Sequence, residues 1–136
     1  MSSKEQKLLI SDASTLINFL RINRVDLLTN LPFKLLVTDV VRSEITHRYQ
    51  LNNLEKAIQT DQFEIVTLDR IEDLKAIVHL KKTGLGDGES VSIVAAHQLG
   101  ATLGIDDVIA TKRAREIYSE LHFLSTQEIM VMNINS

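Results

Sequence analysis

Short apolar runs, separated by longer stretches with helical periodicity, extend along the whole chain. The runs predict strands at residues 7–12, 34–38, 63–68, 101–105 and 122–124. The first run, Lys-Leu-Leu-Ile-Ser-Asp, is of the type that suits a parallel strand covered on both faces. Strands that alternate with helices predict an α/β fold in which a parallel sheet is flanked by helices.

Helices are expected between these strands, because apolar residues there recur at the spacing of one helix face. Their predicted positions are 25–31, 39–48, 51–60, 70–82, 88–99 and 108–121, with one more after the first strand and one after residue 125. A turn-rich loop, residues 83–88, precedes the helix at 88–99. The last helix is expected to begin with a capping box made by Ser125 and Glu128.

Polar residues at the expected starts predict two further helix caps. Ser14 or Thr15 can cap the helix that follows the first strand. Thr38 or Asp39 can cap the helix predicted to continue to Arg48.

The composition is that of a globular protein without disulfides or a membrane segment. The 136 residues are expected to form a single domain over 1–136, with an ordinary apolar share of 44%. Cysteine is absent from the sequence, which excludes disulfides and thiolate metal sites and favours a reducing compartment. Residues 1–7 are polar, and no segment approaches 18 continuous apolar residues. We therefore expect a soluble, cytoplasmic protein that does not contact a membrane.

Acidic residues occur at the predicted carboxyl ends of strands, where sheets of this type bind their ligands. Asp12 ends the first apolar run, and Asp106 and Asp107 directly follow the fourth. Asp87 and Glu89 open the helix after the turn-rich loop. The topology is expected to bring these residues to one edge of the sheet.

Glu44 lies inside a predicted helix rather than at its end. Its position three and four residues after Val41 and Val40 predicts that it points at the sheet and not at solvent. An ionised carboxylate placed there is costly unless it is paired or bound to a metal ion. An ion pair with Arg42, Arg48 or an arginine elsewhere is the alternative explanation.

Each of the other acids also has an ordinary structural explanation. Asp12 can be a helix N-cap or can bind the backbone of the next turn. The helix dipole favours Asp87 and Glu89 in a first turn. One of Asp106 and Asp107 can cap the following helix, although repulsion between adjacent carboxylates disfavours the explanation that both only cap.

Taken together, the acids predict a site for a hard divalent cation. They offer only oxygen ligands, with no cysteine and no histidine pair at metal spacing, which suits Mg²⁺ or Mn²⁺ rather than Zn²⁺. Such ions can activate water and stabilise the leaving oxygen of a phosphodiester. The net charge of −3 argues against a protein that holds nucleic acid by charge alone, but not against one that uses a metal ion.

Four stretches, taken in order, resemble the motifs of the PIN-domain family. Residues 10–17 (Ile-Ser-Asp-Ala-Ser-Thr-Leu-Ile) resemble its opening motif, and residues 37–45 (Val-Thr-Asp-Val-Val-Arg-Ser-Glu-Ile) its second. Residues 85–96, which begin Leu-Gly-Asp-Gly-Glu, resemble the Asp-x-Gly-Glu helix of a VapC-like subgroup. Residues 103–107 (Leu-Gly-Ile-Asp-Asp) resemble the acidic fourth motif of that subgroup. The resemblance spans essentially the whole chain.

This resemblance implies a three-layer fold with four or five parallel strands in the order 3-2-1-4-5. It also implies a Mg²⁺- or Mn²⁺-dependent endoribonuclease, often the toxin of a toxin–antitoxin pair. Its partners would be RNA, a small antitoxin and a second copy of the chain in a homodimer. By position, the catalytic and metal-binding acids are Asp12, Glu44, Glu89 and Asp107, with Asp106 as a further candidate ligand and Ser14 as a residue that orients Asp12 or a water.

The densest basic patch lies on the helix that follows Asp107. Lys112, Arg113 and Arg115 are expected to contact RNA phosphates. The alternative is a solvated helix face with Glu116 and Glu120 in pairing range of these residues. The few aromatic residues do not indicate base stacking of the kind that single-strand binders use.

A catalytically weakened PIN-like module that binds protein or RNA is the alternative function. Val91 and Val108 support it, because they stand where the family often carries polar or acidic residues. A receiver-like phosphoacceptor domain is disfavoured, because no lysine follows the strand at 122–124. A P-loop NTPase is excluded, because the sequence lacks a Gly-x-x-x-x-Gly-Lys loop.

Overall fold

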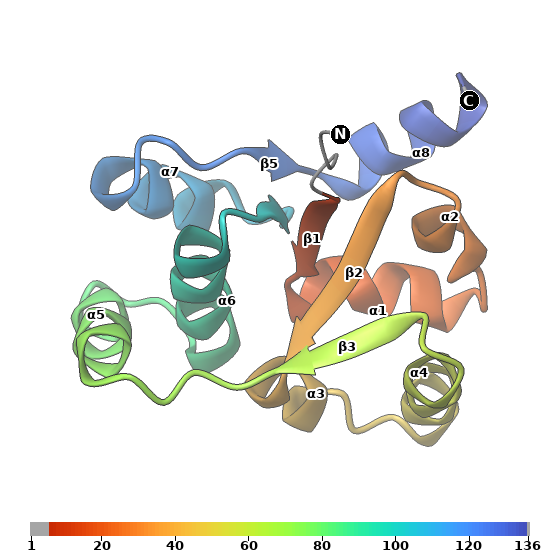
Figure 1. The fold of residues 1–136 in the computed structure, drawn as a ribbon, viewed down its shortest axis with the longest axis horizontal. Helices are drawn as coiled ribbons and strands as arrows, with labels where there is room; N and C mark the ends of the chain where they lie inside the picture. The colour runs from red at the N-terminus through yellow and green to blue at the C-terminus, as the bar shows by residue number, and fades with distance from the viewer. Residues whose placement is uncertain (1–5, 136) are drawn as a thin grey trace, which may run out of the picture.

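The computed structural model describes residues 6–135 as a parallel sheet with helices on both faces (Figure 1). The strands are β1 (Lys7–Ser11), β2 (Phe33–Thr38), β3 (Phe63–Val66), β4 (Thr102–Gly104) and β5 (Phe123–Leu124). They pair in parallel in the order β3-β2-β1-β4-β5. The predicted α/β fold and its strand order are therefore confirmed. Most of the polar segment over residues 1–7, predicted not to be a signal peptide, lies outside the described residues.

Eight helices are described between and after the strands. They are α1 (Ala13–Arg21), α2 (Asp26–Thr29), α3 (Asp39–Glu44), α4 (Arg48–Gln59), α5 (Ile71–Lys82), α6 (Asp87–Leu99), α7 (Val108–Ile117) and α8 (Thr126–Ile134). In Figure 1, α5, α6 and α7 lie to one side of the sheet and α1, α2 and α4 to the other. Over residues 6–135, none of these helices combines the length and the apolar character that crossing a bilayer requires.

The two faces of the sheet bury two separate cores, because neighbouring side chains of a strand point to opposite faces. Leu9 of β1 and Leu35 of β2 pack into the core with α1, α3 and α4. Ile10 and Leu36, one residue further along each strand, pack into the core with α5, α6 and α7. Each fully buried side chain of this kind contributes about 1.5–3 kcal/mol. The continuous apolar runs of the sequence are explained by this burial on both faces.

Two predicted helix boundaries are wrong: the start of the helix after Asp12 and the end of the helix that contains Glu44. The first helix begins at Ala13, so Ser14 and Thr15 lie inside it and do not cap it. The helix expected over 39–48 ends at Glu44, because Ile45 leaves the helical conformation (φ −89°, ψ 95°) and is buried in the core. A new helix, α4, begins at Arg48.

Other boundaries also differ. The helix expected over 108–121 ends at Ile117, where Tyr118 takes a non-helical conformation (φ −126°, ψ 81°) and stacks on His97. Leu121 then packs into the core that the sheet forms with α5, α6 and α7. The strands β3 and β4 are shorter than predicted, and α6 begins one residue earlier, at Asp87.

Two helix caps are confirmed. The Thr38 hydroxyl accepts a hydrogen bond from the Val41 N–H at 3.1 Å, which caps α3. The capping box of α8 is complete, because Ser125 accepts from the Glu128 N–H and the Glu128 carboxylate accepts from the Ser125 N–H. Both caps stand at the carboxyl ends of strands, which fixes the start of each following helix at that edge of the sheet.

Candidate functional site

Four carboxylates from four different parts of the chain gather at the carboxyl edge of the sheet. Asp12 follows β1, Glu44 ends α3, Glu89 lies in the first turn of α6, and Asp107 precedes α7. Their charges act on one another. Asp12 raises the pKa of both Glu44 and Glu89, and Asp107 raises the pKa of both Asp12 and Glu89. The structure thus brings together the four acids that the sequence singled out.

Asp12 is the most deeply buried acid of this group, at 3% exposure. Burial is the main cause that raises its pKa, with the nearby Asp107 as a smaller one. The hydroxyl of Ser14 donates a hydrogen bond to Asp12 Oδ2 at 3.1 Å, which favours the ionised form and orients the carboxylate. Asp12 stands at the N-cap position of α1, but its side chain makes no capping hydrogen bond.

Glu44 does not point at the sheet as predicted, because it is an exposed side chain at the last residue of the short helix α3. It accepts a hydrogen bond from the Gly88 N–H at the start of α6, at 3.3 Å. Partial desolvation raises its pKa, and Asp12 and Asp87 raise it further. The ion pair with Arg42 is not formed, since Arg42 binds Glu55 at 2.6 Å.

Gly88 leaves the space that the Glu44 carboxylate occupies. A Cβ atom built on Gly88 would lie only 2.0 Å from Glu44 Oε1. The glycine of the Asp-Gly-Glu segment therefore allows the Glu44 carboxylate of α3 to approach the start of α6 in its observed position. The contact joins the second and third acidic motifs of the chain.

Glu89 and Asp107 each use one carboxylate oxygen at a helix start. Glu89 Oε1 accepts from the Gly86 N–H at 3.0 Å, and Asp107 Oδ1 accepts from the Ala110 N–H at 3.0 Å. Burial raises the pKa of Glu89 and the neighbouring Asp107 raises it further, whereas the Ala110 amide lowers the pKa of Asp107.

Asp106 does not bind the residues that Asp107 binds; its partners lie in α1 and at the start of α8. Its Oδ1 accepts from the Thr126 N–H at 2.7 Å, and its Oδ2 accepts from the Thr126 hydroxyl at 2.6 Å. Thr15 and Asn18 of α1 also donate to Oδ2, both at 3.3 Å. Asp106 thereby ties α1 to the start of α8. Asp107 caps the following helix, as expected of one of the two acids, whereas the amide that Asp106 accepts belongs to α8.

The donor set of this site suits a hard divalent cation. Among residues 6–135, none of the four gathered acids forms an ion pair, whereas Asp87 binds Lys81 at 2.6 Å. Three of the four have a raised pKa, with burial as the main cause in each and neighbouring carboxylates as smaller causes. In the part of the chain that the structure describes, however, no three acids converge closely enough to hold an ion.

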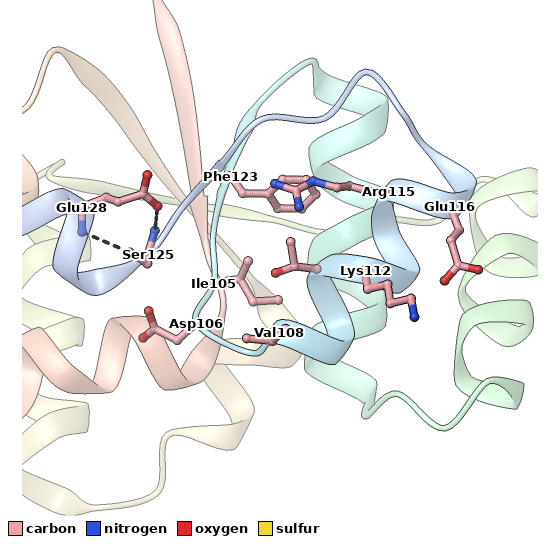
Figure 2. A pocket seen from close by; sticks show the side chains of 10 residues that line it. Ile105, Asp106, Val108, Lys112, Arg115, Glu116, Phe123, Ser125 and Glu128 are labelled. Atoms are coloured by element: carbon pink, nitrogen blue, oxygen red, sulfur yellow. Dashed lines mark hydrogen bonds between the residues drawn. The ribbon is translucent and has the colours of Figure 1, made fainter.

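The predicted basic patch is only partly directed at the site. Lys112 and Arg115 line a cleft of about 540 Å³ that also reaches Asp106 and Val108, whereas Arg113 does not line it (Figure 2). No ion pair with Glu116 or Glu120 is formed by these basic residues within 6–135, and Glu120 instead binds His97 at 2.8 Å. All three basic side chains are nevertheless exposed, as expected of a solvated helix face.

Several residues that build the site were missed in the sequence. They are Thr15, Asn18 and Thr126, which hold Asp106, Gly88, which makes room for Glu44, and Phe123, which lies under Arg115. Only Gly88 carried a signal, since a glycine between two acids in a helix start calls for a reason.

With this geometry in place, the family of the chain can be stated. The family model described as a PIN domain (DUF3368) matches residues 8–129. The chain therefore belongs to the PIN-domain family, and the matched region contains all four gathered acids. No curated protein sequence matches the chain.

Solved structures share the fold at low sequence identity. A PilT N-terminus domain protein from Sulfolobus solfataricus is 14% identical, with a TM-score of 0.58 over 95% of each chain. PAE2754 from Pyrobaculum aerophilum is 15% identical, with a TM-score of 0.60 over 96% of this chain and 92% of that one. VapBC2 from Rickettsia felis, solved bound to a DNA fragment from its promoter, is 13% identical, with a TM-score of 0.57 over 87% and 98%. These likenesses establish the fold alone.

The contact between Gly88 and Glu44 predicts that Gly88→Ala displaces the Glu44 carboxylate. The added Cβ would meet Oε1 at 2.0 Å, and the end of a glutamate side chain can move away at small cost. We expect the fold to be kept and the pKa of Glu44 to fall toward its ordinary value, measured by NMR titration of side-chain carboxyls. Gly86→Ala is the matched control, because its Cβ would lie 3.6 Å from Glu89 Oε1. Unchanged titration of Glu44 in Gly88→Ala would contradict the described contact.

The raised pKa of Asp12 predicts that Asp12→Asn stabilises the metal-free protein at neutral pH, by about 0.5–2 kcal/mol. A folded-state pKa above the ordinary aspartate value of 3.8 means that wild-type stability falls as pH rises through the folded pKa. The advantage of the variant should therefore shrink as the pH is lowered toward 3.8. Chemical denaturation in EDTA at several pH values measures this, with Asp69→Asn in an exposed loop as the control. An equal or lower stability of Asp12→Asn at pH 7 would refute it.

Proposed function

We propose that this chain is a Mg²⁺- or Mn²⁺-dependent endoribonuclease that hydrolyses phosphodiester bonds of RNA. The observation that carries the proposal is the group formed by Asp12, Glu44, Glu89 and Asp107. These acids stand at the ligand-binding edge of a parallel sheet and have no basic partner among the described residues. Keeping several unpaired acids together lowers stability, and such a cost is typical of a functional site. Membership of the PIN-domain family supports the same activity.

The four carboxylates are the proposed ligands of the ion. A bound Mg²⁺ or Mn²⁺ would supply activation of the attacking water and stabilisation of the leaving oxygen. Asp12 is held by Ser14, and Glu44 by the Gly88 amide, so both carboxylates are oriented before any ion arrives. Glu89 and Asp107 are each held by a backbone amide through one oxygen, which leaves the other oxygen of each for the ion.

The remaining predicted residues receive supporting roles. Asp106, listed as a candidate ligand from the sequence, is proposed to fix the position of Asp107 through its hydrogen bonds to α1 and α8. Lys112 and Arg115 are proposed to contact RNA within the cleft that they line. Arg113 lies outside that cleft and is assigned no contact with RNA.

The partners proposed for the protein follow from its resemblance to VapC-like toxins. They are an RNA substrate, a small antitoxin protein and a second copy of the chain. A solved VapBC2 assembly shares the fold, at 13% identity. An exposed apolar stripe on α5, formed by Ile71, Leu74 and Val78, offers a surface for such contacts.

A binding module without catalysis is the second candidate function. The observation that favours it is that no three acids among residues 6–135 converge on one point. Val108 also supports it, because this side chain is 81% exposed beside Asp107, where an apolar contact with a partner protein would bury it. The two functions differ in whether a divalent ion binds and whether RNA is cut.

The nuclease proposal predicts cleavage of single-stranded RNA that requires Mn²⁺ or Mg²⁺ and stops in EDTA. Purified protein incubated with labelled RNA and each metal, resolved on a denaturing gel, tests this, and calorimetry measures the binding of the ion. A preparation of the Asp12→Asn variant, purified identically, controls for contaminating nucleases. If the wild type cuts no RNA and binds neither metal, the binding-module function replaces the nuclease.

Asp106 and Asp107 are predicted to respond differently to replacement. Asp107→Asn should abolish cleavage with little loss of stability, because asparagine still accepts the Ala110 amide. Asp106→Asn should lower stability by about 1–3 kcal/mol, because one of its accepting oxygens is lost. It should retain measurable cleavage, reduced about 10–100-fold as is typical of residues that support a ligand. Thermal melts and cleavage rates of both variants decide the assignment, and the reverse order of effects would make Asp106 the ligand.

A further inference from the structure

The cleft beside the acids has one feature that the proposed function does not yet use. It lies between α7, β5 and the start of α8, with a volume of about 540 Å³ (Figure 2). Asp106 and Val108, the two residues on either side of Asp107, form one end of it. A molecule bound in the cleft would therefore extend directly to the carboxylate group.

Arg115 and Phe123 form a stacked pair inside this cleft. The guanidinium carbon of Arg115 lies 4.9 Å from the centre of the Phe123 ring, and Figure 2 shows the guanidinium lying over that ring. Phe123 is partly buried and packs against the core formed with α5, α6 and α7, so the ring is a fixed support. Arg115 is exposed and forms no ion pair within residues 6–135. Its outer face is therefore open to a flat ligand.

The charges around the cleft favour a flat, uncharged ligand over a phosphate at its centre. Asp106, Glu116 and Glu128 line the cleft together with the two basic residues. Asp106 and Glu128 are already occupied by helix amides, yet their negative charges remain. A phosphate placed among three carboxylates would be repelled, whereas a neutral ring would not.

We propose that the cleft is a stacking subsite for one unpaired nucleobase of the RNA substrate. The base stacks on the outer face of the Arg115 guanidinium, which Phe123 holds flat from below. Lys112, one helical turn before Arg115 on the same face of α7, lies at the rim, where it can reach the backbone phosphate of that nucleotide. The inference rests on the proposed function and makes it more specific, because a base must leave a duplex to enter the cleft.

Physical chemistry supports this use of an arginine. Proteins that read unpaired RNA stack bases on aromatic rings and on guanidinium planes alike. A guanidinium already fixed on a ring loses little conformational freedom when a base binds it. Lysine cannot replace arginine in this role, since its ammonium group has no plane on which to stack.

The test measures stacking separately from cleavage. A short single-stranded RNA containing 2-aminopurine is titrated with full-length protein in Ca²⁺, its integrity is checked on a gel, and cleavage is measured separately with Mn²⁺. Stacking of the fluorescent base should change its emission on binding to the wild type. Arg115→Lys should abolish this change and weaken binding about fivefold or more, the effect expected for the loss of one stacked base.

Arg113→Lys is the matched control, because it makes the same exchange on the same helix outside the cleft. It should keep both the emission change and the affinity. Phe123→Leu, which removes the support of the guanidinium, should act in the same direction as Arg115→Lys. If it fails to fold by circular dichroism, the two arginine variants still decide the outcome.

The possible results separate the inference from the nuclease proposal. Stacking that depends on Arg115, without cleavage in Mn²⁺, would support the subsite and refute the nuclease. Cleavage in which Arg115→Lys and Arg113→Lys behave alike would support the nuclease and overturn the subsite. A wild type that leaves the emission of every RNA unchanged would also overturn the subsite, as would equal affinity for a duplex that hides the base.

Discussion

Repulsion among carboxylates is the constraint on which the rest of this structure depends. A parallel sheet collects the carboxyl ends of its strands at one edge, and this chain places acids after β1 and β4 and on two helices at the same edge. In folding, the protein must hold these charges together in a partly desolvated place, as the raised pKa values of Asp12, Glu44 and Glu89 indicate. The two apolar cores, one on each face of the sheet, supply the stability that offsets this cost.

Helix starts are the means by which the repulsion is limited. Backbone amides at the starts of α6, α7 and α8 donate to Glu89, Asp107 and Asp106 respectively, and the first two amides act to lower the pKa of the carboxyl that they bind. Glu89 and Asp107 therefore stabilise helix starts and are also proposed metal ligands. The two explanations do not exclude each other.

The sequence predicted all five strands, most clearly β1 and β2, whose apolar runs are buried on both faces, and family resemblance added the strand order. The prediction was wrong where a single residue departs from the helical conformation and ends a helix early. Helical periodicity continues through Ile45, yet this residue is extended, and Glu44 consequently faces α6 rather than the sheet. It failed again for contacts between distant segments. Nothing in the order of residues links Asp106 to Asn18, or indicates that Phe123 lies beneath Arg115 after the chain has turned.

The hydrogen bonds of Asp106 also have a consequence for the order in which the protein becomes complete during synthesis. Its partners come from α1, near the start of the chain, and from Thr126, near the end. A nascent chain that has emerged only as far as Asp107 already carries all four gathered acids and the α1 donors to Asp106, but it lacks Thr126. The acidic edge therefore takes its final form only when the start of α8 has left the ribosome.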